Sequence, residues 1–228
     1  MENNSSVQMF DEEIMAQGLK ELRNNVSKRY VILKKIMDIV CSLAGIIFLS
    51  PLFIVVAILI KLEDPKGKVF FRQERYGQYP KKFKMLKFRS MVHNAEELLD
   101  QLQHLNEQTG PAFKIKDDPR ITRIGKFIRK TSIDELPQLF NVLKGDMSLV
   151  GPRPPIPHEV EQYTEYQIQR LAVKPGLTCI WQVSGRNNIG FDEWVDMDLE
   201  YINTRNLWLD IKLIFKTVGV LFGDETAS

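Results

Sequence analysis

The chain has 228 residues, of which 44% are apolar and 26% are charged; this balance suits one compact domain with an appendage and excludes a disordered chain or a membrane protein with many spans. The formal net charge is only +2, so we expect no nucleic acid as a partner. The two cysteines, Cys41 and Cys179, lie far apart in the sequence, which excludes a disulfide scaffold and a cysteine-rich zinc site and suits a reducing cytosol.

Residues 1–27 form a polar stretch whose main apolar side chains are Leu19 and Leu22. We interpret this stretch as a mobile or weakly helical tail and assign it no chemistry. The second segment, 28–62, contains a run without any charge at residues 39–60. As one helix this run would be about 33 Å long at about 1.5 Å per residue. That length is enough to cross a bilayer, so we expect membrane contact.

Ser50 and Pro51 lie near the middle of the apolar run. A proline inside a helix removes a hydrogen bond, and Ser-Pro is typical of a helix start, so we predict a break here between two helices. Basic residues on both sides of the run favour a cytoplasmic position for both flanks and therefore a re-entrant hairpin. The alternative is a spanning helix with a proline kink. The basic flanking residues are Lys28, Arg29, Lys34, Lys35, Lys61, Lys66, Lys68, Arg72 and Arg75.

Residues 63–228 have the pattern of a cytosolic domain. Aromatic, alternating segments at 68–71 and 83–88 around a turn at 77–80 predict a β-hairpin, and 176–183 is typical of a strand. Apolar spacing and end signals predict helices at 94–106, 121–130, 157–171, 191–204 and 208–222, with another ending at Lys144. The last helix is apolar around most of its circumference, which fits a membrane surface and a buried core position equally well. We therefore predict an α+β fold, predominantly helical, with a re-entrant membrane helix-break-helix and a small β element.

An adjacent acid pair, Asp134 and Glu135, lies in the segment with the most unusual composition, residues 131–154. At a helix start a carboxylate stays ionised, which suits a nucleophile or a ligand of a hard cation. The alternative is that Ser132 and Glu135 form a capping box. Pro137 fits better if Asp134 is itself the N-cap, and the sequence leaves both frames open.

Basic residues surround the acid pair in the sequence, and one of them, Arg153, lies between two prolines, Pro152 and Pro154. Arginine's planar fork suits phosphate oxygens, so arginines near acids indicate a polyanionic substrate beside a divalent metal. The alternative for each arginine is a solvated or ion-paired surface position. The three histidines lack the spacing of a metal site. The other basic residues are Lys87, Arg89, Arg120, Arg123 and Arg129.

Four segments together resemble the bacterial sugar transferases: the Ser50-Pro51 pair, KFRSM at 87–91, the stretch 118–154 that ends in GPRP, and KPGLTCIWQVSGR at 174–186. More narrowly, they resemble the monotopic polyprenyl-phosphate phosphoglycosyl transferases, which initiate the assembly of surface polysaccharides. The likeness covers nearly everything after residue 28. Some members of that family carry a multi-helix membrane region where this chain has about 30 polar residues, so a minimal version is expected.

The resemblance implies a reaction and the residues that perform it. Sugar 1-phosphate would pass from a UDP-sugar to polyprenyl phosphate, and UMP would be released. Asp134 would attack the sugar-proximal phosphorus and form an aspartyl phosphosugar. Glu135 would assist, and both acids would hold Mg²⁺. Positions that would bind substrate are Lys87, Arg89, Arg129, Pro152, Arg153 and Pro154.

The same resemblance implies a location and partners. Residues 63–228 would form a catalytic domain facing the cytoplasm at the bacterial inner membrane, where other polysaccharide assembly enzymes would act nearby. Two alternatives remain at this stage: a membrane-anchored glycosyltransferase that releases UDP, and a non-catalytic scaffold in which the acid pair is only a helix cap.

Overall fold

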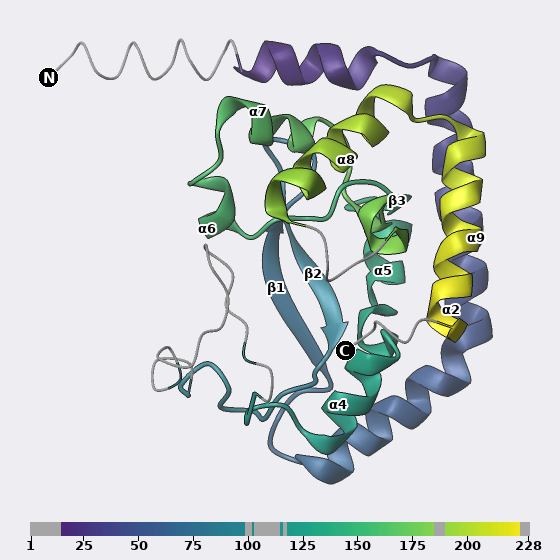
Figure 1. Cartoon of the computed structure of the whole chain (residues 1–228). Helices are drawn as coiled ribbons and strands as arrows, with labels where there is room; N and C mark the ends of the chain where they lie inside the picture. Colours follow the sequence, from purple (N-terminus) through teal and green to yellow (C-terminus); the bar gives the residue numbers. More distant parts are fainter. Residues whose placement is uncertain (1–14, 99–101, 103–114, 116–117, 185–189, 224–228) are drawn as a thin grey trace, which may run out of the picture.

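The computed structural model describes the chain outside residues 1–14, 99–101, 103–114, 116–117, 185–189 and 224–228. Helices predominate in it, and two small two-stranded sheets complete an α+β fold, as predicted (Figure 1). In chain order the helices and strands after residue 27 are α2 (Lys28–Glu63), β1 (Phe70–Tyr76), β2 (Lys82–Phe88), α4 (Arg123–Lys130), η2 (Ile133–Glu135), α5 (Gln138–Lys144), β3 (Ser148–Val150), α6 (Pro157–Val160), α7 (Glu165–Ile168), η3 (Gln169–Ala172), β4 (Gly176–Thr178), η4 (Trp181–Val183), α8 (Phe191–Thr204) and α9 (Leu207–Gly223).

Helix α2 is continuous, which corrects the predicted helix-break-helix. It begins after Ser27, whose hydroxyl accepts a hydrogen bond from the Tyr30 amide, and it continues through Pro51 to Glu63. The Ser50 hydroxyl donates to the Ile47 carbonyl at 2.8 Å, an acceptor within the preceding turn. Figure 1 shows the helix changing direction along its length. Neighbouring backbone groups and a serine hydroxyl can keep a helix intact across a proline, so the effect is a bend rather than an interruption.

The first half of α2 is fixed to the rest of the protein by polar contacts. Asp38 accepts hydrogen bonds from the Ser148 hydroxyl and the Leu149 amide, both at 3.0 Å. Lys34 forms a salt bridge of 2.9 Å with Asp210, a fully buried residue of α9. These contacts place α9 alongside α2 (Figure 1).

Large apolar side chains are exposed on α2, α4 and α9, and we call this set of side chains the apolar face. In the 18-residue segment of α2 with the highest hydropathy, only 11% is buried. Within the described chain, α2 is the one helix that is long and apolar enough to cross a membrane. Helix α9 packs through Leu213 but exposes three large apolar side chains, so it combines the core and surface positions left open above. Exposed members of the apolar face include Ile32, Ile47, Phe48, Ile54, Ile58 and Leu62 of α2, Phe127 of α4, and Trp208, Phe215 and Val218 of α9.

The predicted hairpin is confirmed. Strands β1 and β2 pair antiparallel, with Phe70 opposite Phe88 and Tyr76 opposite Lys82. The ring of Phe88 packs against Phe53 of α2, with a centroid distance of 5.4 Å. The far end of α2 is therefore attached to the hairpin that carries Lys87.

The second sheet, formed by β3 and β4, positions the loop that follows β3. Strands β3 and β4 pair in parallel, with Ser148 opposite Gly176. Strand β3 was not predicted, and the strand predicted at 176–183 ends at Thr178 because the chain turns into η4. Three-residue strands carry too little alternation to be recognised in a sequence. The core around this sheet includes Met85, Val142, Met147, Val150, Val195, Ile202 and Leu213.

Most predicted helices are confirmed, and two are corrected. Helices α4, α5, α8 and α9 lie where the sequence placed them. The helix predicted at 157–171 is instead three short elements, α6, α7 and η3. The helix predicted at 94–106 falls mostly outside the described residues, and its described start at 94–98 is a turn.

The polar N-terminal stretch is helical at residues 15–24 and packs on the body of the protein. Leu19 is buried, and Leu22 contacts the main core. Arg205 donates to the carbonyls of Leu22 and Arg23 at 2.8 and 2.9 Å. The described part of this stretch is therefore docked by apolar and backbone contacts rather than a free tail.

Candidate active site

The acid pair lies on η2, a single 3-10 turn between α4 and α5. Ser132 has a positive φ of 53° and forms no side-chain cap, and α5 begins only after Pro137. Both helix-cap frames considered for the sequence are therefore wrong. The tight turn between two helices carries the acids, and capping does not explain their presence.

Asp134 is a buried carboxyl group without a matching partner. It is 8% exposed, and burial raises its pKa to about 6, which the nearby positive charges of Lys87 and Arg129 partly counteract. Within the described part of the chain its side chain forms no salt bridge and no hydrogen bond to another residue. A desolvated carboxylate of this kind is more basic than one in water and has a free oxygen with which to react.

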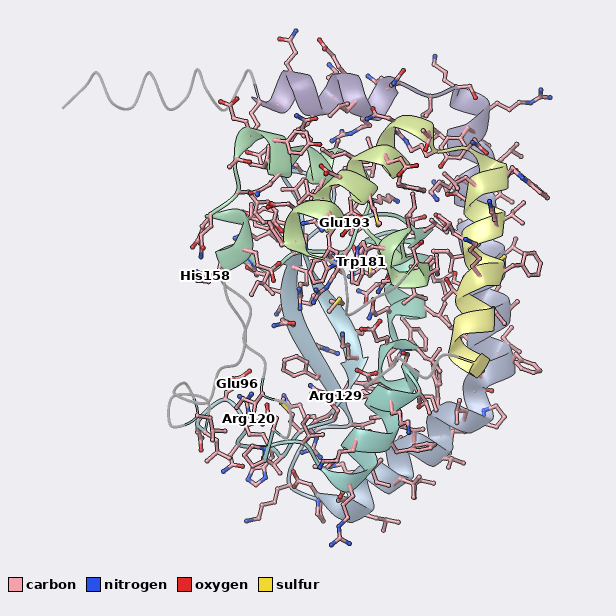
Figure 2. The ribbon with its side chains drawn as sticks, viewed as in Figure 1. Glu96, Arg120, Arg129, His158, Trp181 and Glu193 are labelled. Atoms are coloured by element: carbon pink, nitrogen blue, oxygen red, sulfur yellow. The ribbon has the colours of Figure 1, made fainter. Side chains whose placement is uncertain are left out.

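Neighbouring strands and helices supply the charges around Asp134. Lys87 of β2 forms a salt bridge of 2.6 Å with Glu135. Arg129, at the end of α4, donates from Nε to the Ser90 hydroxyl at 2.9 Å. Arg120 lies beside the segment that holds Glu96 (Figure 2) and donates to the Ala95 carbonyl. The structure thus brings Asp134, Glu135, Lys87 and Arg129 together, as predicted.

A small cleft adjoins the acid pair and contains further predicted residues. Its polar lining carries three basic side chains and one acidic side chain. Lys87, Glu135, Arg153 and Pro154 were predicted from the sequence, and they meet here from three separate segments of the chain. The lining residues with polar or charged side chains are Arg75, Lys87, Glu135, Gln138, Arg153 and Gln182.

The loop that carries Arg153 is held by backbone pairing. Gly176 donates to the Pro152 carbonyl at 2.9 Å, and Gly151 donates to the Thr178 carbonyl at 3.0 Å. A Cβ atom on Gly151 would lie 2.5 Å from the Lys174 carbonyl oxygen, so only glycine permits this close approach. Arg153 extends over the ring of Trp194, with 5.9 Å from its guanidinium carbon to the ring centroid.

Some predicted residues lie elsewhere. Arg89 forms a salt bridge of 2.5 Å with Asp64 just beyond the end of α2, so it joins α2 to the hairpin. Pro152 contributes its carbonyl to the sheet and does not line the cleft. Ser50 and Pro51 are exposed on α2. His158 is exposed on α6 (Figure 2).

Arg75 is the main cleft residue that the sequence analysis missed, since it was counted only among the membrane-flanking bases. It is buried on β1, and its Nη1 donates to the Pro154 carbonyl at 3.0 Å. No local pattern marks it, because the contact joins residues that are far apart in the chain. Gln138 and Gln182 were missed for the same reason.

The carboxylates of Asp134 and Glu135 are candidate ligands for a metal ion. Among the described residues no group of three or more His, Cys, Asp or Glu side chains is placed to hold a metal ion. Mg²⁺ needs only one or two carboxylates and keeps waters and substrate phosphates as its other ligands. The two oxygen donors and the uncompensated charge of Asp134 fit such an ion.

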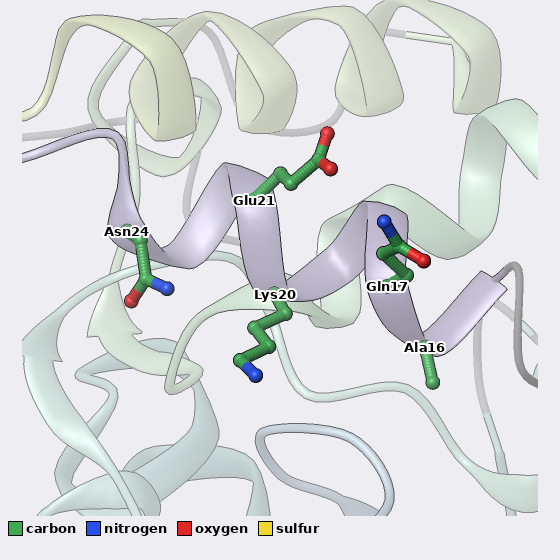
Figure 3. A pocket seen from close by; sticks show the side chains of 5 residues that line it. All are labelled: Ala16, Gln17, Lys20, Glu21 and Asn24. Carbon is green, nitrogen blue, oxygen red and sulfur yellow. The ribbon is translucent and has the colours of Figure 1, made fainter.

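A second hollow, in contrast, has no features of an active site. It lies along the N-terminal helix and is lined by Ala16, Gln17, Lys20, Glu21 and Asn24 (Figure 3). All five come from one exposed helix, and none contacts the acid pair.

The structure places an acid pair beside a cleft with basic residues, and comparison with known proteins specifies the class. Residues 29–224 match the bacterial sugar transferase family. The chain belongs to this family.

Curated relatives support this assignment. The chain is 48% identical over 193 residues to the galactosyl transferase CpsE of Streptococcus agalactiae, covering 84% of this chain and 42% of that protein. It is 46% identical over 225 residues to the undecaprenyl-phosphate galactose phosphotransferase of Salmonella typhimurium, covering 96% of this chain and 46% of that protein. It is 38% identical over 189 residues to the exopolysaccharide production protein ExoY of Rhizobium meliloti, covering 81% of this chain and 83% of that protein. The chain thus spans about half the length of the first two relatives and most of the third.

Proposed function

We propose that this protein transfers a sugar 1-phosphate from a UDP-sugar to polyprenyl phosphate and releases UMP. The observation that carries the proposal is Asp134, a buried carboxylate that no described side chain pairs with, beside a cleft with a positive lining. The names of similar proteins agree with this chemistry. They include the Salmonella relative and a UDP-glucose:undecaprenyl-phosphate glucose-1-phosphate transferase of Xanthomonas campestris, 39% identical over 210 residues.

In the first step an oxygen of Asp134 attacks the sugar-proximal phosphorus. A new bond forms between that oxygen and phosphorus, and the bond from phosphorus to the bridging oxygen breaks. The electron pair leaves on the phosphate of UMP, and the sugar phosphate remains on Asp134. Lys87 and Arg129 offset negative charge around the reacting phosphoryl group, while Arg153 holds the nucleotide.

In the second step a phosphate oxygen of polyprenyl phosphate attacks the same phosphorus. The bond to Asp134 breaks, which restores the carboxylate and yields a polyprenyl diphosphosugar. Phosphate monoesters lose their second proton with a pKa of about 6, so the acceptor needs little help at neutral pH. Glu135, paired with Lys87, would accept any proton that the acceptor still carries.

Asp134 and Glu135 are the residues that would hold Mg²⁺, and the ion would supply positive charge to the diphosphate. The protein's own part is to keep the two carboxylates adjacent on the rigid turn η2 and to exclude water from Asp134.

Analysis of the nucleotide product tests the proposal directly. Incubation of the protein with a panel of UDP-sugars and polyprenyl phosphate should release UMP and give a lipid diphosphosugar by mass spectrometry. Release of UDP with a lipid monophosphosugar would show a glycosyltransferase without the phosphosugar intermediate. No product with any sugar would favour a scaffold.

We also propose that the apolar face lies in the cytoplasmic membrane and that α2 enters from the cytoplasm and returns to it. Basic residues flank both ends of the apolar run of α2, and the buried Asp38 and the partly buried Lys34 join its first half to the body of the protein. Such an arrangement keeps the site at the height of the lipid phosphate while the lipid tail stays in the bilayer. Other enzymes of polysaccharide assembly would then extend the lipid-linked sugar.

Cysteine labelling tests this topology. Single cysteines placed at Lys28 and Lys66, in a variant lacking Cys41, should both be protected from an impermeant reagent added to intact cells and should both react in opened cells. Pro51→Ala should favour a straight helix and expose one of the two positions. Labelling of one flank from outside in the unsubstituted helix would contradict the re-entrant topology.

A further inference from the structure

Most buried arginines of this protein have an acidic partner. Arg89 pairs with Asp64, Arg120 with Asp118, and Arg170 with Asp198. Arg205 instead donates to backbone carbonyls of α8 and of the N-terminal helix. Buried charges without a counter-charge are costly, so pairing of this kind is the rule.

Arg75 departs from that rule. It is 7% exposed, yet among the described residues all of its hydrogen-bond acceptors are neutral. Its Nε and Nη2 donate to Gln73 Oε1 at 3.2 and 2.6 Å, and its Nη1 donates to the Pro154 carbonyl. Burial and repulsion by Arg153 lower the pKa of Arg75 to about 10. Glu159 and Glu135 attract Arg75 and raise its pKa, but among the described residues neither accepts a hydrogen bond from its guanidinium.

The cleft provides the reason for such an arrangement. Arg75, Lys87 and Arg153 line it, and its acidic residue, Glu135, is already bound to Lys87. Among the described residues, Arg75 therefore faces the cleft without an acid bound to its guanidinium. The hydrogen bond from Arg75 to the Pro154 carbonyl places Arg75 beside the loop of Arg153, whereas the residues whose charges most affect the pKa of Asp134 are Lys87, Glu135 and Arg129.

We propose that Arg75 binds the phosphate of the nucleotide half of the donor, next to Arg153. This inference rests on the proposed function, because it assigns Arg75 to the UMP leaving group. When the bond between the two phosphorus groups breaks, negative charge collects on the UMP oxygen, and the fixed guanidinium of Arg75 neutralises it there. The contact with the Pro154 carbonyl keeps Arg75 and Arg153 on the same phosphate.

Binding of UMP and uridine to the full-length protein in detergent separates this role from a structural one, since the two ligands differ only in the phosphate. Arg75→Gln should weaken UMP binding by about 10- to 100-fold, the range that charged hydrogen bonds account for, and leave uridine binding unchanged. Arg75→Lys should recover part of the loss. The control is Arg72→Gln, which removes an exposed arginine from the same strand and should bind UMP like the parent protein.

Three results would overturn the inference: unchanged UMP binding in Arg75→Gln, an equal loss of UMP and uridine binding, or the same loss in Arg72→Gln. Equal loss would mean that Arg75 only positions the 152–154 loop. The product assay remains a separate test. Release of UDP by the parent protein would contradict the proposed function, whereas the Arg75 assignment is decided by comparing UMP with uridine.

Discussion

Two buried aspartates show how this protein separates reactive from structural acids. Asp134 on η2 and Asp198 on α8 are both less than one-tenth exposed, and burial raises the pKa of each to about 6. Asp198 is bound by Arg170, which donates from Nε and Nη2 to the same carboxylate oxygen at 2.8 and 2.7 Å. Lys87 and Arg129 lie near Asp134 and lower its pKa, but among the described residues neither forms a salt bridge with it.

The two aspartates differ in whether the negative charge of the carboxylate is available to a ligand. The charge of Asp198 is matched inside the protein, so its removal should damage the fold. The charge of Asp134 is matched by no described side chain and adjoins a cleft that carries more basic than acidic groups. Perturbed pKa values alone do not distinguish the two acids, but the geometry of their partners does.

The largest expected effect is on activity. Asp134→Asn removes the attacking oxygen's charge but preserves the shape of the side chain. We expect product formation to fall by at least about 10³-fold and trapping of a labelled phosphosugar on the protein to disappear. The melting temperature should not fall, since a buried charge has been removed. Full turnover, or labelling at another residue, would refute the assignment of Asp134.

The matched substitution should affect stability instead. Asp198→Asn leaves Arg170 buried without its counter-charge, which should cost about 3–5 kcal/mol of unfolding free energy. Thermal unfolding in detergent measures this loss. Protein that remains folded should still form the labelled adduct, and an intact melting temperature with abolished labelling would reverse the comparison.

The pH dependence should report Asp134. Its carboxyl group must be ionised to attack, and its pKa is about 6, so the rate of adduct formation should rise with pH and reach half its maximum near pH 6. Lys87→Met removes the largest effect that lowers this pKa, so the midpoint should move to higher pH. Rapid-quench measurements at saturating UDP-sugar test both values. A midpoint near pH 4 would mean that Asp134 is not desolvated.

The smallest effect should come from Arg153, which lines the cleft but is not among the residues that most affect the pKa of Asp134. Arg153→Ala should therefore raise KM for the UDP-sugar about 10-fold with a smaller change in kcat. Steady-state kinetics give this ratio, and an unchanged KM would count against nucleotide binding by Arg153.

Local sequence signals identified much of this site because its parts are short and chemically unusual. The acid pair, Lys87, Arg129 and the 152–154 loop are each recognisable within a few residues, and the structure brings most of them together. The pairing of Arg89 with Asp64 was not predicted, because Asp64 follows the end of α2 and no local pattern relates it to the KFRSM segment. The capping prediction failed because Ser132 adopts a left-handed backbone conformation.

The sequence by itself determined the long apolar helix, the hairpin, the four longer helices and the acid pair, since hydrophobic periodicity and composition act locally. Tertiary structure decided which charges are matched. Arg75 meets Pro154, Lys87 meets Glu135 and Arg170 meets Asp198 only after the chain has folded. Burial and charge pairing depend on distances between remote segments, so the reactive and the structural aspartate become distinguishable only in three dimensions.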